Sequence, residues 1–205
     1  MSNNNNISIL TIGHSDHRIE RFLVLLARSR VDAVADVRSV PQSRFNPQYN
    51  RDDLAQSLQA AGIYYVFLGD ELGARRREPE CYLDGKARYE LIACTPSFKC
   101  GLERLQAGAA KMRIALLCAE KDPLVCHRSI LVCRHLRQIG LSISHIHYDG
   151  RVESHETFEQ RLLKAVQIDR KDLLTSEREA IEAAYDLQGD RIAFTRNHSV
   201  PDRRE

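Results

Sequence analysis

Short β-rich runs alternate with helical stripes along most of the chain, and this alternation restricts the fold more than any other sequence feature. Five runs have the length and apolar character of strands, at 7–12, 32–37, 63–68, 113–118 and 141–148. A strand–helix–strand order favours a mostly parallel sheet covered by helices on both faces. We therefore predict a single three-layer α/β domain with a mostly parallel sheet of about five strands.

The segments between these runs carry helix signals. In the stretch 18–30, apolar residues recur at the three- and four-residue spacing of an amphipathic helix. The residues expected to cap later helices are Asn50, Thr95, Ser154 and Ser176. We expect the domain to span residues 7–190, with tails at 1–6 and 191–205.

Several function classes are disfavoured by what the sequence lacks. No apolar run reaches the roughly 18 residues of a membrane span, and the Asn-rich start lacks the pattern of a secretory signal. Without an export signal, the six cysteines are expected to be reduced thiols in a cytoplasmic protein. Glycine-rich phosphate motifs are also missing, so we expect no nucleotide cofactor. The oligomeric state is left open.

The charge of the chain gives weak information about partners. A net charge of +2 is too mild to indicate nucleic acid on its own. One dense basic run, Arg75–Arg77, fits either a solvated loop or an anion contact. Nucleic acid therefore stays open as a partner, beside a small anionic or nucleotide-like substrate.

The first polar strand-end loop follows the run at 7–12. Right-handed crossovers place such loops on one edge of a parallel sheet, where ligands bind. Gly13 allows a tight turn, and His14 and Ser15 come just after it. Histidine is the natural acid or base at neutral pH, although a single histidine is more often structural.

The second loop follows the run at 32–37. Asp36 and Arg38 share one side of the strand, and Ser43, Arg44 and Asn46 extend the polar loop. Buried charges are costly unless they are paired or bind a ligand. The arginines could therefore form a structural ion pair with Asp36, or they could grip a phosphate or carboxylate while Asp36 orients a catalytic partner.

The third loop follows the run at 113–118 and has the most chemistry. Cys118 and Glu120 lie on one side of the strand end, and both are catalytic candidates. A carboxylate at such a position suits a general base or a nucleophile. Cys126, His127 and Arg128 then open a helix, whose N-terminus could lower the pKa of Cys126 and bind an anion. The alternative is that both cysteines are inert, buried thiols.

Arg128 has two interpretations. A cation at a helix N-terminus is disfavoured by the helix dipole unless an anion offsets it. Arg128 therefore either contacts a bound anion or forms an ion pair with Asp36 or Glu120. The cysteine-phosphatase pattern, with an arginine six positions after the nucleophile, is absent, because Arg128 follows Cys126 by only two.

A metal centre is conceivable but is not predicted. The residues that could contribute to it are His14, Cys118, Cys126 and His127. Their spacing matches no paired CxxC arrangement of a zinc site. We therefore assign no metal.

Taken together, these motifs resemble the family called domain of unknown function 488. They are Ile12–Ser15, Asp36–Arg38, Ser43–Pro47, Leu117–Glu120 and Cys126–Arg128. The resemblance extends past His145 to the region 184–188, and one departure is Asp16, where asparagine is more usual. It implies an α/β domain with a shared polar site, and it supplies no reaction.

The leading hypothesis is a hydrolase or group transferase acting on a small anionic, possibly nucleotide-like substrate. Arg38, Arg44 and Arg128 would position the anion, and Glu120 or His14 would be the acid or base. No cofactor is expected. The alternative is a non-catalytic module that binds a nucleotide or nucleic acid, with Phe45, Tyr49 and Tyr82 stacking on bases.

Overall fold

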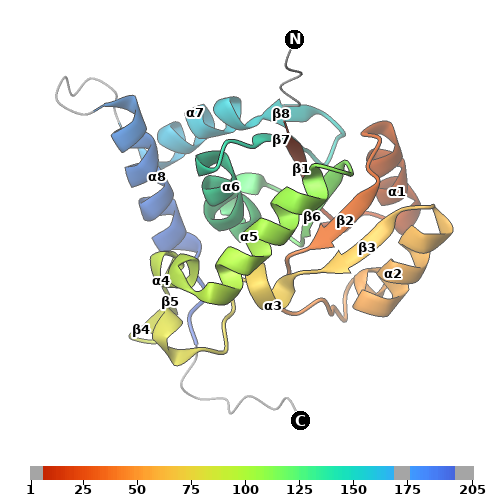
Figure 1. The fold of residues 1–205 in the computed structure, drawn as a ribbon, viewed down its shortest axis with the longest axis horizontal. Coiled ribbons are helices and arrows are strands. Elements are labelled where there is room, and N and C mark those ends of the chain that lie inside the picture. Colours follow the sequence, from red (N-terminus) through yellow and green to blue (C-terminus); the bar gives the residue numbers. More distant parts are fainter. Residues whose placement is uncertain (1–6, 169–175, 197–205) are drawn as a thin grey trace.

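The sheet contains six strands in the order β3-β2-β6-β1-β7-β8 (Figure 1). The computed structural model describes residues 7–168 and 176–196. The strands are β1 (Ser8–Gly13), β2 (Ala33–Asp36), β3 (Tyr64–Phe67), β6 (Ile114–Cys118), β7 (Ser142–Ile146) and β8 (Val152–Ser154). The first five strands in the sheet order are parallel, as predicted, and β8 pairs antiparallel with β7. The unexpected sixth strand has only three residues, too few for a sequence to show alternation.

Helices cover both faces of this sheet and confirm the three-layer prediction. They are α1 (Ile19–Arg28), α2 (Arg51–Ala60), α3 (Gly69–Leu72), α4 (Tyr89–Cys94), α5 (Pro96–Ala109), α6 (Arg134–Gln138), α7 (His155–Val166) and α8 (Glu177–Ile192). Shorter helical turns are η1 (Pro47–Tyr49), η2 (Pro79–Cys81), η3 (Pro123–Val125) and the π-helical η4 (Arg128–Cys133), which leads into α6. A small hairpin joins β4 (Tyr82–Leu83) to β5 (Lys86–Ala87).

Successive residues along a strand point to opposite faces of the sheet and so belong to two separate apolar layers. Leu10 of β1 and Leu117 of β6 face the layer built with α1 and α2. Their neighbours Ile9 and Leu116 face the layer built with α5, η4, α6, α7 and α8. Burial on both faces explains why the strand at Ile114–Cys118 is a continuous apolar run.

Three of the four expected caps form. The hydroxyls of Thr95, Ser154 and Ser176 accept hydrogen bonds from backbone N–H groups in the first turns of α5, α7 and α8. Asn50 differs, because its side chain makes no cap bond to α2 and instead accepts from the backbone N–H of Ser43 at 2.8 Å. Asn50 therefore holds the polar loop after β2 rather than the helix.

The C-terminal segment packs on the domain further than expected. Helix α8 continues to Ile192, and the carbonyl of Phe194 accepts a hydrogen bond from the N–H of Ala87 at 2.8 Å. The remaining tail positions, 1–6 and 197–205, lie outside the described residues. Within the described ranges, no helix combines the length and apolar character needed to cross a membrane. All six cysteines are free thiols.

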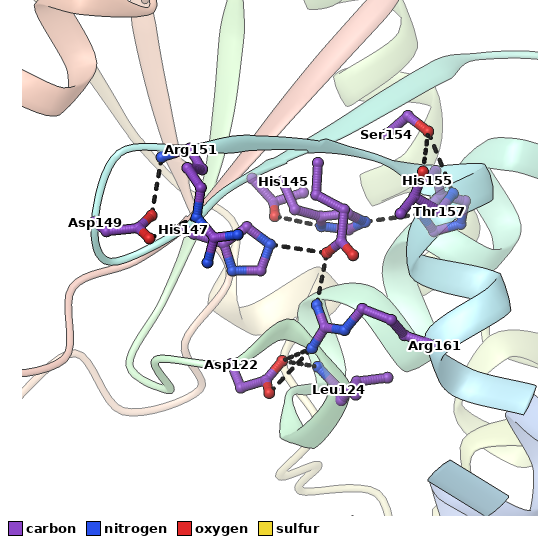
Figure 2. A network of polar contacts seen from close by, with 12 residues as sticks. Asp122, Leu124, His145, His147, Asp149, Arg151, Ser154, His155, Thr157 and Arg161 are labelled. Carbon is purple, nitrogen blue, oxygen red and sulfur yellow. Dashed lines mark hydrogen bonds and ion pairs between the residues drawn. The ribbon is translucent and has the colours of Figure 1, made fainter. Parts of the chain in front are cut away.

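Two polar networks connect α7 with the edge of the sheet formed by β7 and β8 (Figure 2). In the first, His145 joins Thr11 at 2.8 Å and His155 at 2.9 Å, and His155 continues to the hydroxyl of Tyr185 at 2.9 Å. In the second, Arg161 of α7 donates to Glu153 and to Asp122. The second network therefore ties the loop after β6 to the β7–β8 edge of the sheet.

Candidate active site

A pocket of about 520 Å³ lies beyond the ends of β1, β2 and β6. This is the region where the three polar loops were expected to converge. The predicted site residues that line it are His14, Ser15, Arg38, Ser43, Asn46, Cys118, Glu120 and His127. The other four, Asp36, Arg44, Cys126 and Arg128, do not line it.

The sheet order explains this location. The chain leaves β1 toward α1 on one face, and it leaves the neighbouring β6 toward η4 and α6 on the other. Adjacent parallel strands whose connections go to opposite faces form a topological switch point, where a crevice opens at their carboxyl ends.

Gly13 lets the β6 loop approach the end of β1. The N–H groups of His14 and Ser15 donate to the carbonyls of Cys118 and Ala119, at 3.0 and 2.9 Å. A Cβ at Gly13 would lie 1.9 Å from the carbonyl oxygen of Glu120, a separation no side chain could accept. Glycine is therefore needed here for close approach, which brings the first and third loops together.

Asp36 and Arg38 form an ion pair, which was one of the two interpretations that the sequence left open. The fully buried Asp36 carboxylate accepts from Nε and Nη2 of Arg38 at 2.9 and 2.6 Å, and also from the hydroxyl of Tyr65 at 2.9 Å. Arg38 spans the pocket wall, and its Nη1 lies 3.2 Å from Nε2 of His14. The pair is thus structural and also fixes the guanidinium at the pocket surface.

His14 is held as a neutral ring. Burial and then the neighbouring Arg38 lower its pKa to about 4. Its Nδ1 lies 2.9 Å from the carbonyl of Ser15, so Nδ1 carries the proton and Nε2 accepts from Arg38. Both ring nitrogens are therefore engaged, which favours a positioning role for His14 over the acid–base role that we expected.

Four side chains meet at the end of β6, and we call Cys118, Glu120, Cys126 and His127 the thiol cluster. Their ligand-type atoms all lie within 4.8 Å of one another. Both thiols donate to the same oxygen, Oε2 of Glu120, at 2.9 Å each. Nδ1 of His127 lies 3.5 Å from Sγ of Cys118. The thiols are buried, while Glu120 is exposed on the pocket side.

The ionisation of the cluster differs from the expectation. Burial opposes the charge on Glu120, but His127 and the two thiols outweigh it and lower the pKa of this carboxyl to about 2. Burial raises the pKa of Cys126 well above its usual value. The helix start therefore does not activate Cys126 as a thiolate nucleophile, because the thiol is enclosed and its hydrogen-bond acceptor is already a carboxylate.

Arg128 fits neither of its two interpretations. It is completely buried behind the thiol cluster, so it does not reach the pocket. Its Nη1 donates to the backbone carbonyl of Glu120 at 2.7 Å, not to a carboxylate. Its Nε and Nη2 have no hydrogen-bond partner among the described residues. The backbone N–H of Ser129 is also used internally, by the carbonyl of Cys126.

The thiol cluster is the one set of described side chains that could hold a metal ion. Three of its members, Cys118, Cys126 and His127, are ligands that the sequence suggested, and the fourth is Glu120 instead of His14. Their spacing along the sequence matches no common metal-binding motif. The sequence signal that was available is the period of two at a strand end, which places Cys118 and Glu120 on one side.

The basic run at 75–77 separates into three different roles. Arg75 is exposed and lines the pocket, with its guanidinium 4.6 Å from the ring centre of Phe194. Arg76 is buried and donates to the carbonyls of Asp70 and Glu71. Arg77 is exposed and outside the pocket. Nothing in the sequence pointed to Phe194 as a pocket residue.

The loop after β2 turns its tip away from the pocket. Arg44 and Phe45 are exposed there, and Phe45 has 95% of its surface open to solvent. Tyr49 is fully buried and stacks on His14 with ring centres 4.1 Å apart, so it cannot stack on a base. Tyr82 is covered by Arg196 at 3.6 Å. Two of the three rings expected to contact bases are therefore occupied.

Comparisons with known proteins give one match. No curated protein and no solved structure matches the chain. The profile of a family described as "Domain of unknown function DUF488" matches residues 18–134, more than half of the chain. The matched segment includes Asp36, Arg38 and the whole thiol cluster, and begins after His14. The chain therefore belongs to the DUF488 family.

Proposed function

We propose that this protein is an enzyme, a hydrolase or group transferase, that binds a small anionic and nucleotide-like substrate in the pocket at the ends of β1, β2 and β6. One observation carries the proposal: Arg38 and Arg75 line the same pocket as Cys118, Glu120 and His127. The two arginines would attract and orient an anion, and the other residues would offer reactive atoms beside it. A volume of about 520 Å³ is in the range of small-molecule sites.

The anion side of the pocket combines a buried and an exposed cation. Arg38 is rigid because Asp36 holds two of its nitrogens and His14 meets the third. Arg75 is exposed and adaptable, and it rests on Phe194. A planar guanidinium suits phosphate and carboxylate groups, because it presents parallel N–H donors. Nε and Nη2 of Arg38 already donate to Asp36, so Arg75 is the one of the two that would offer such a pair to an anion, while Arg38 supplies fixed positive charge.

The reactive side is centred on Glu120. Its low pKa keeps the carboxylate ionised at neutral pH, and it faces the pocket. In a hydrolysis, Glu120 would orient the attacking water and accept its proton as the water oxygen bonds to the substrate and the bond to the leaving group breaks; the leaving group departs with the electron pair of that bond and takes a proton from solvent. His14 would hold Arg38 in place. Arg44 and Arg128 are assigned no substrate contact, because neither lines the pocket and Arg128 is fully buried.

Anion binding is tested by thermal melting in phosphate and in chloride at matched ionic strength. A ligand that binds only the folded state raises the melting temperature, so phosphate should stabilise the wild type. Arg75→Ala should remove most of this stabilisation. Arg77→Ala is the matched control, since Arg77 is exposed but outside the pocket. Equal melting temperatures in the two salts would contradict the proposed anion site.

Turnover is tested separately with a panel of nucleotides and phosphate esters. Glu120→Gln should bind phosphate and lose activity on any substrate that the wild type converts, by about 10²-fold or more. Full activity of Glu120→Gln would remove its assigned role. Tight oligonucleotide binding that weakens steeply with salt, without turnover, would instead favour the non-catalytic module.

A further inference from the structure

We propose that the thiol cluster is a binding site for one divalent transition-metal ion, with Zn²⁺ as the best fit. Two thiolates, an imidazole and a carboxylate are the ligand types that zinc accepts in a tetrahedral arrangement. Hard cations such as Mg²⁺ prefer oxygen ligands only, so the two cysteines argue against them. The metal site shares Glu120 with the proposed catalytic pocket, but metal binding can be tested apart from catalysis, because an ion can bind whether or not the pocket turns over a substrate.

One distance within the cluster already agrees with a tetrahedral ion, and two are shorter because they are hydrogen bonds. Zinc–sulfur and zinc–nitrogen bonds of about 2.3 and about 2.0 Å imply a sulfur–nitrogen edge of about 3.5 Å. The distance from Sγ of Cys118 to Nδ1 of His127 is 3.5 Å. Oε2 of Glu120 is closer to the sulfurs, at 2.9 Å, because it accepts their protons. A metal ion would replace those protons, and the exposed Glu120 side chain is free to move outward.

The imidazole is already oriented as a ligand. Nε2 of His127 lies 2.9 Å from the carbonyl oxygen of Val37, at the end of β2. When Nε2 carries the proton and donates it to this carbonyl, Nδ1 presents its lone pair to the sulfurs. A backbone carbonyl on the remote ring nitrogen is the usual outer partner of a metal-bound histidine.

Arg128 supplies an independent argument from charge. A divalent ion with two thiolates and one carboxylate carries one net negative charge, and the two thiol protons leave to solvent. Arg128 is completely buried beside the cluster, with Nε and Nη2 unpartnered among the described residues. A buried cation without a carboxylate partner is costly. A metal–thiolate centre would offset its charge and offer sulfur acceptors to its unused N–H groups.

The proposed ligands also differ in how far they are exposed to solvent. Cys118 and Cys126 have 2% and 1% of their surface exposed, whereas Glu120 is exposed toward the pocket. Catalytic zinc sites keep three protein ligands and one open position. Glu120 is thus the ligand that a pocket-bound anion or water would displace first.

The test uses the full-length protein, reduced, treated with a chelator, freed of chelator and titrated with Co²⁺. Cobalt bound by thiolates gives a sulfur-to-metal charge-transfer band, which oxygen and nitrogen ligands do not. We expect the band to saturate at about one ion per chain and to disappear when Zn²⁺ is added. Cys118→Ser and Cys126→Ser should each weaken the band, and the double variant should abolish it.

Matched controls keep the result interpretable. Cys94→Ser and Cys100→Ser change exposed cysteines outside the cluster, and they should leave the band unchanged. Glu120→Gln keeps both thiols and should retain the band with about tenfold or more weaker cobalt binding. The proposal is overturned if the wild type shows no charge-transfer band. It is also overturned if the band survives in the folded double variant or depends on Cys94 or Cys100.

Discussion

Nε2 of His127 lies 2.9 Å from the carbonyl oxygen of Val37. This contact joins the loop after β6 to the end of β2, its neighbour in the sheet. The ring is therefore positioned by a strand end and not by a surface loop alone, and its Nδ1 faces Cys118. The chemistry of the site rests on the relative register of two adjacent parallel strands, which the sheet itself maintains.

Replacing Arg128 should weaken metal binding more than it weakens the fold. Arg128→Met keeps most of the buried volume but removes the positive charge behind the thiol cluster and the hydrogen bond to Glu120. Outer-sphere changes typically reduce metal affinity about 10–100-fold, and we expect a loss of that size in cobalt titrations. Arg134→Met is the control, because Arg134 pairs with Glu182 and Asp186 on α8.

The same arginine gives a stability comparison. Arg128→Ala leaves a cavity and should lower the free energy of unfolding by about 2–5 kcal/mol. Arg128→Met fills most of that space and should lose less. Urea unfolding of both variants measures the difference, and a methionine variant as unstable as the alanine variant would contradict the importance of volume at this position.

Gly13→Ala should destabilise the protein through contact with the backbone of Glu120. The added Cβ would meet the carbonyl oxygen at 1.9 Å, so β1 or the loop after β6 has to shift. Overpacking of this kind costs about 1–3 kcal/mol, measured by urea unfolding. Gly108→Ala in α5 is the control, since its Cβ meets only the tip of Ile114 and it gains helix propensity. Wild-type stability in Gly13→Ala would disprove the tight approach.

Arg161 should restrain the loop that carries the thiol cluster. Its guanidinium bonds both oxygens of Asp122, at 2.9 and 3.1 Å, and Asp122 caps η3 through the N–H of Leu124 (Figure 2). A partly exposed ion pair contributes up to about 1 kcal/mol, so Arg161→Met should remain folded. Hydrogen exchange at residues 121–126 should become faster.

Arg151→Met provides the comparison for that experiment. Arg151 is also in Figure 2, but it pairs with Asp149 at an exposed turn and not with Asp122. Its replacement should leave exchange at 121–126 unchanged. If both variants exchange alike in this loop, Arg161 does not hold it.

The sequence was informative where a pattern repeats and uninformative where a partner lies far along the chain. Periodicity predicted β1, β2, β3, β6 and β7, because each strand is long enough to show its apolar character. It also placed the three polar loops at strand ends, and residues from all three loops line one pocket. The strand β8 was missed because Val152–Ser154 is too short to carry a signal.

Side-chain partners were beyond the reach of the sequence. Within one basic run, Arg75 faces the pocket whereas Arg76 is buried, and only the tertiary positions of their partners separate them. Arg128 was expected to meet an anion or a carboxylate, and it meets a backbone carbonyl. Its contact exists because Gly13 lets the Glu120 backbone close over β1, and no local pattern reports such an approach.

The buried histidines should make the fold sensitive to acid. Tyr185 donates to Glu159, so its oxygen accepts from His155, and the bonds then continue through His145 to Thr11. When the hydrogen bonds run in this direction, each imidazole ring is neutral, because one of its nitrogens donates a hydrogen bond and the other accepts one. Burial and then Arg137 lower the pKa of His155 to about 3, and burial also lowers that of His145 well below its usual value.

The direction in which stability changes with pH follows from the pH at which the folded and the unfolded chain each take up protons. In the unfolded chain both rings protonate near pH 6.5, their ordinary pKa, whereas the folded protein keeps them neutral to much lower pH. The stability is therefore complete above pH 6.5 and falls as the pH drops toward the folded pKa values. Between about pH 7 and about pH 5 the expected loss is about 2 kcal/mol for His155, and His145 adds a loss of the same sign. Burial raises the pKa of Glu159, which offsets a part of this loss.

Urea unfolding of the wild type and of the double variant His145→Leu/His155→Phe, at about pH 5 and about pH 7, measures this contribution. The double variant is expected to be less stable at both pH values, since Thr11 loses its partner. Its stability should nevertheless change less with pH, because the two groups that bind protons only in the unfolded state are gone. Other histidines titrate equally in both proteins and cancel in the comparison. An equal pH dependence in the two proteins would show that the buried rings are already protonated in the folded state, contrary to the donor–acceptor order that their contacts imply.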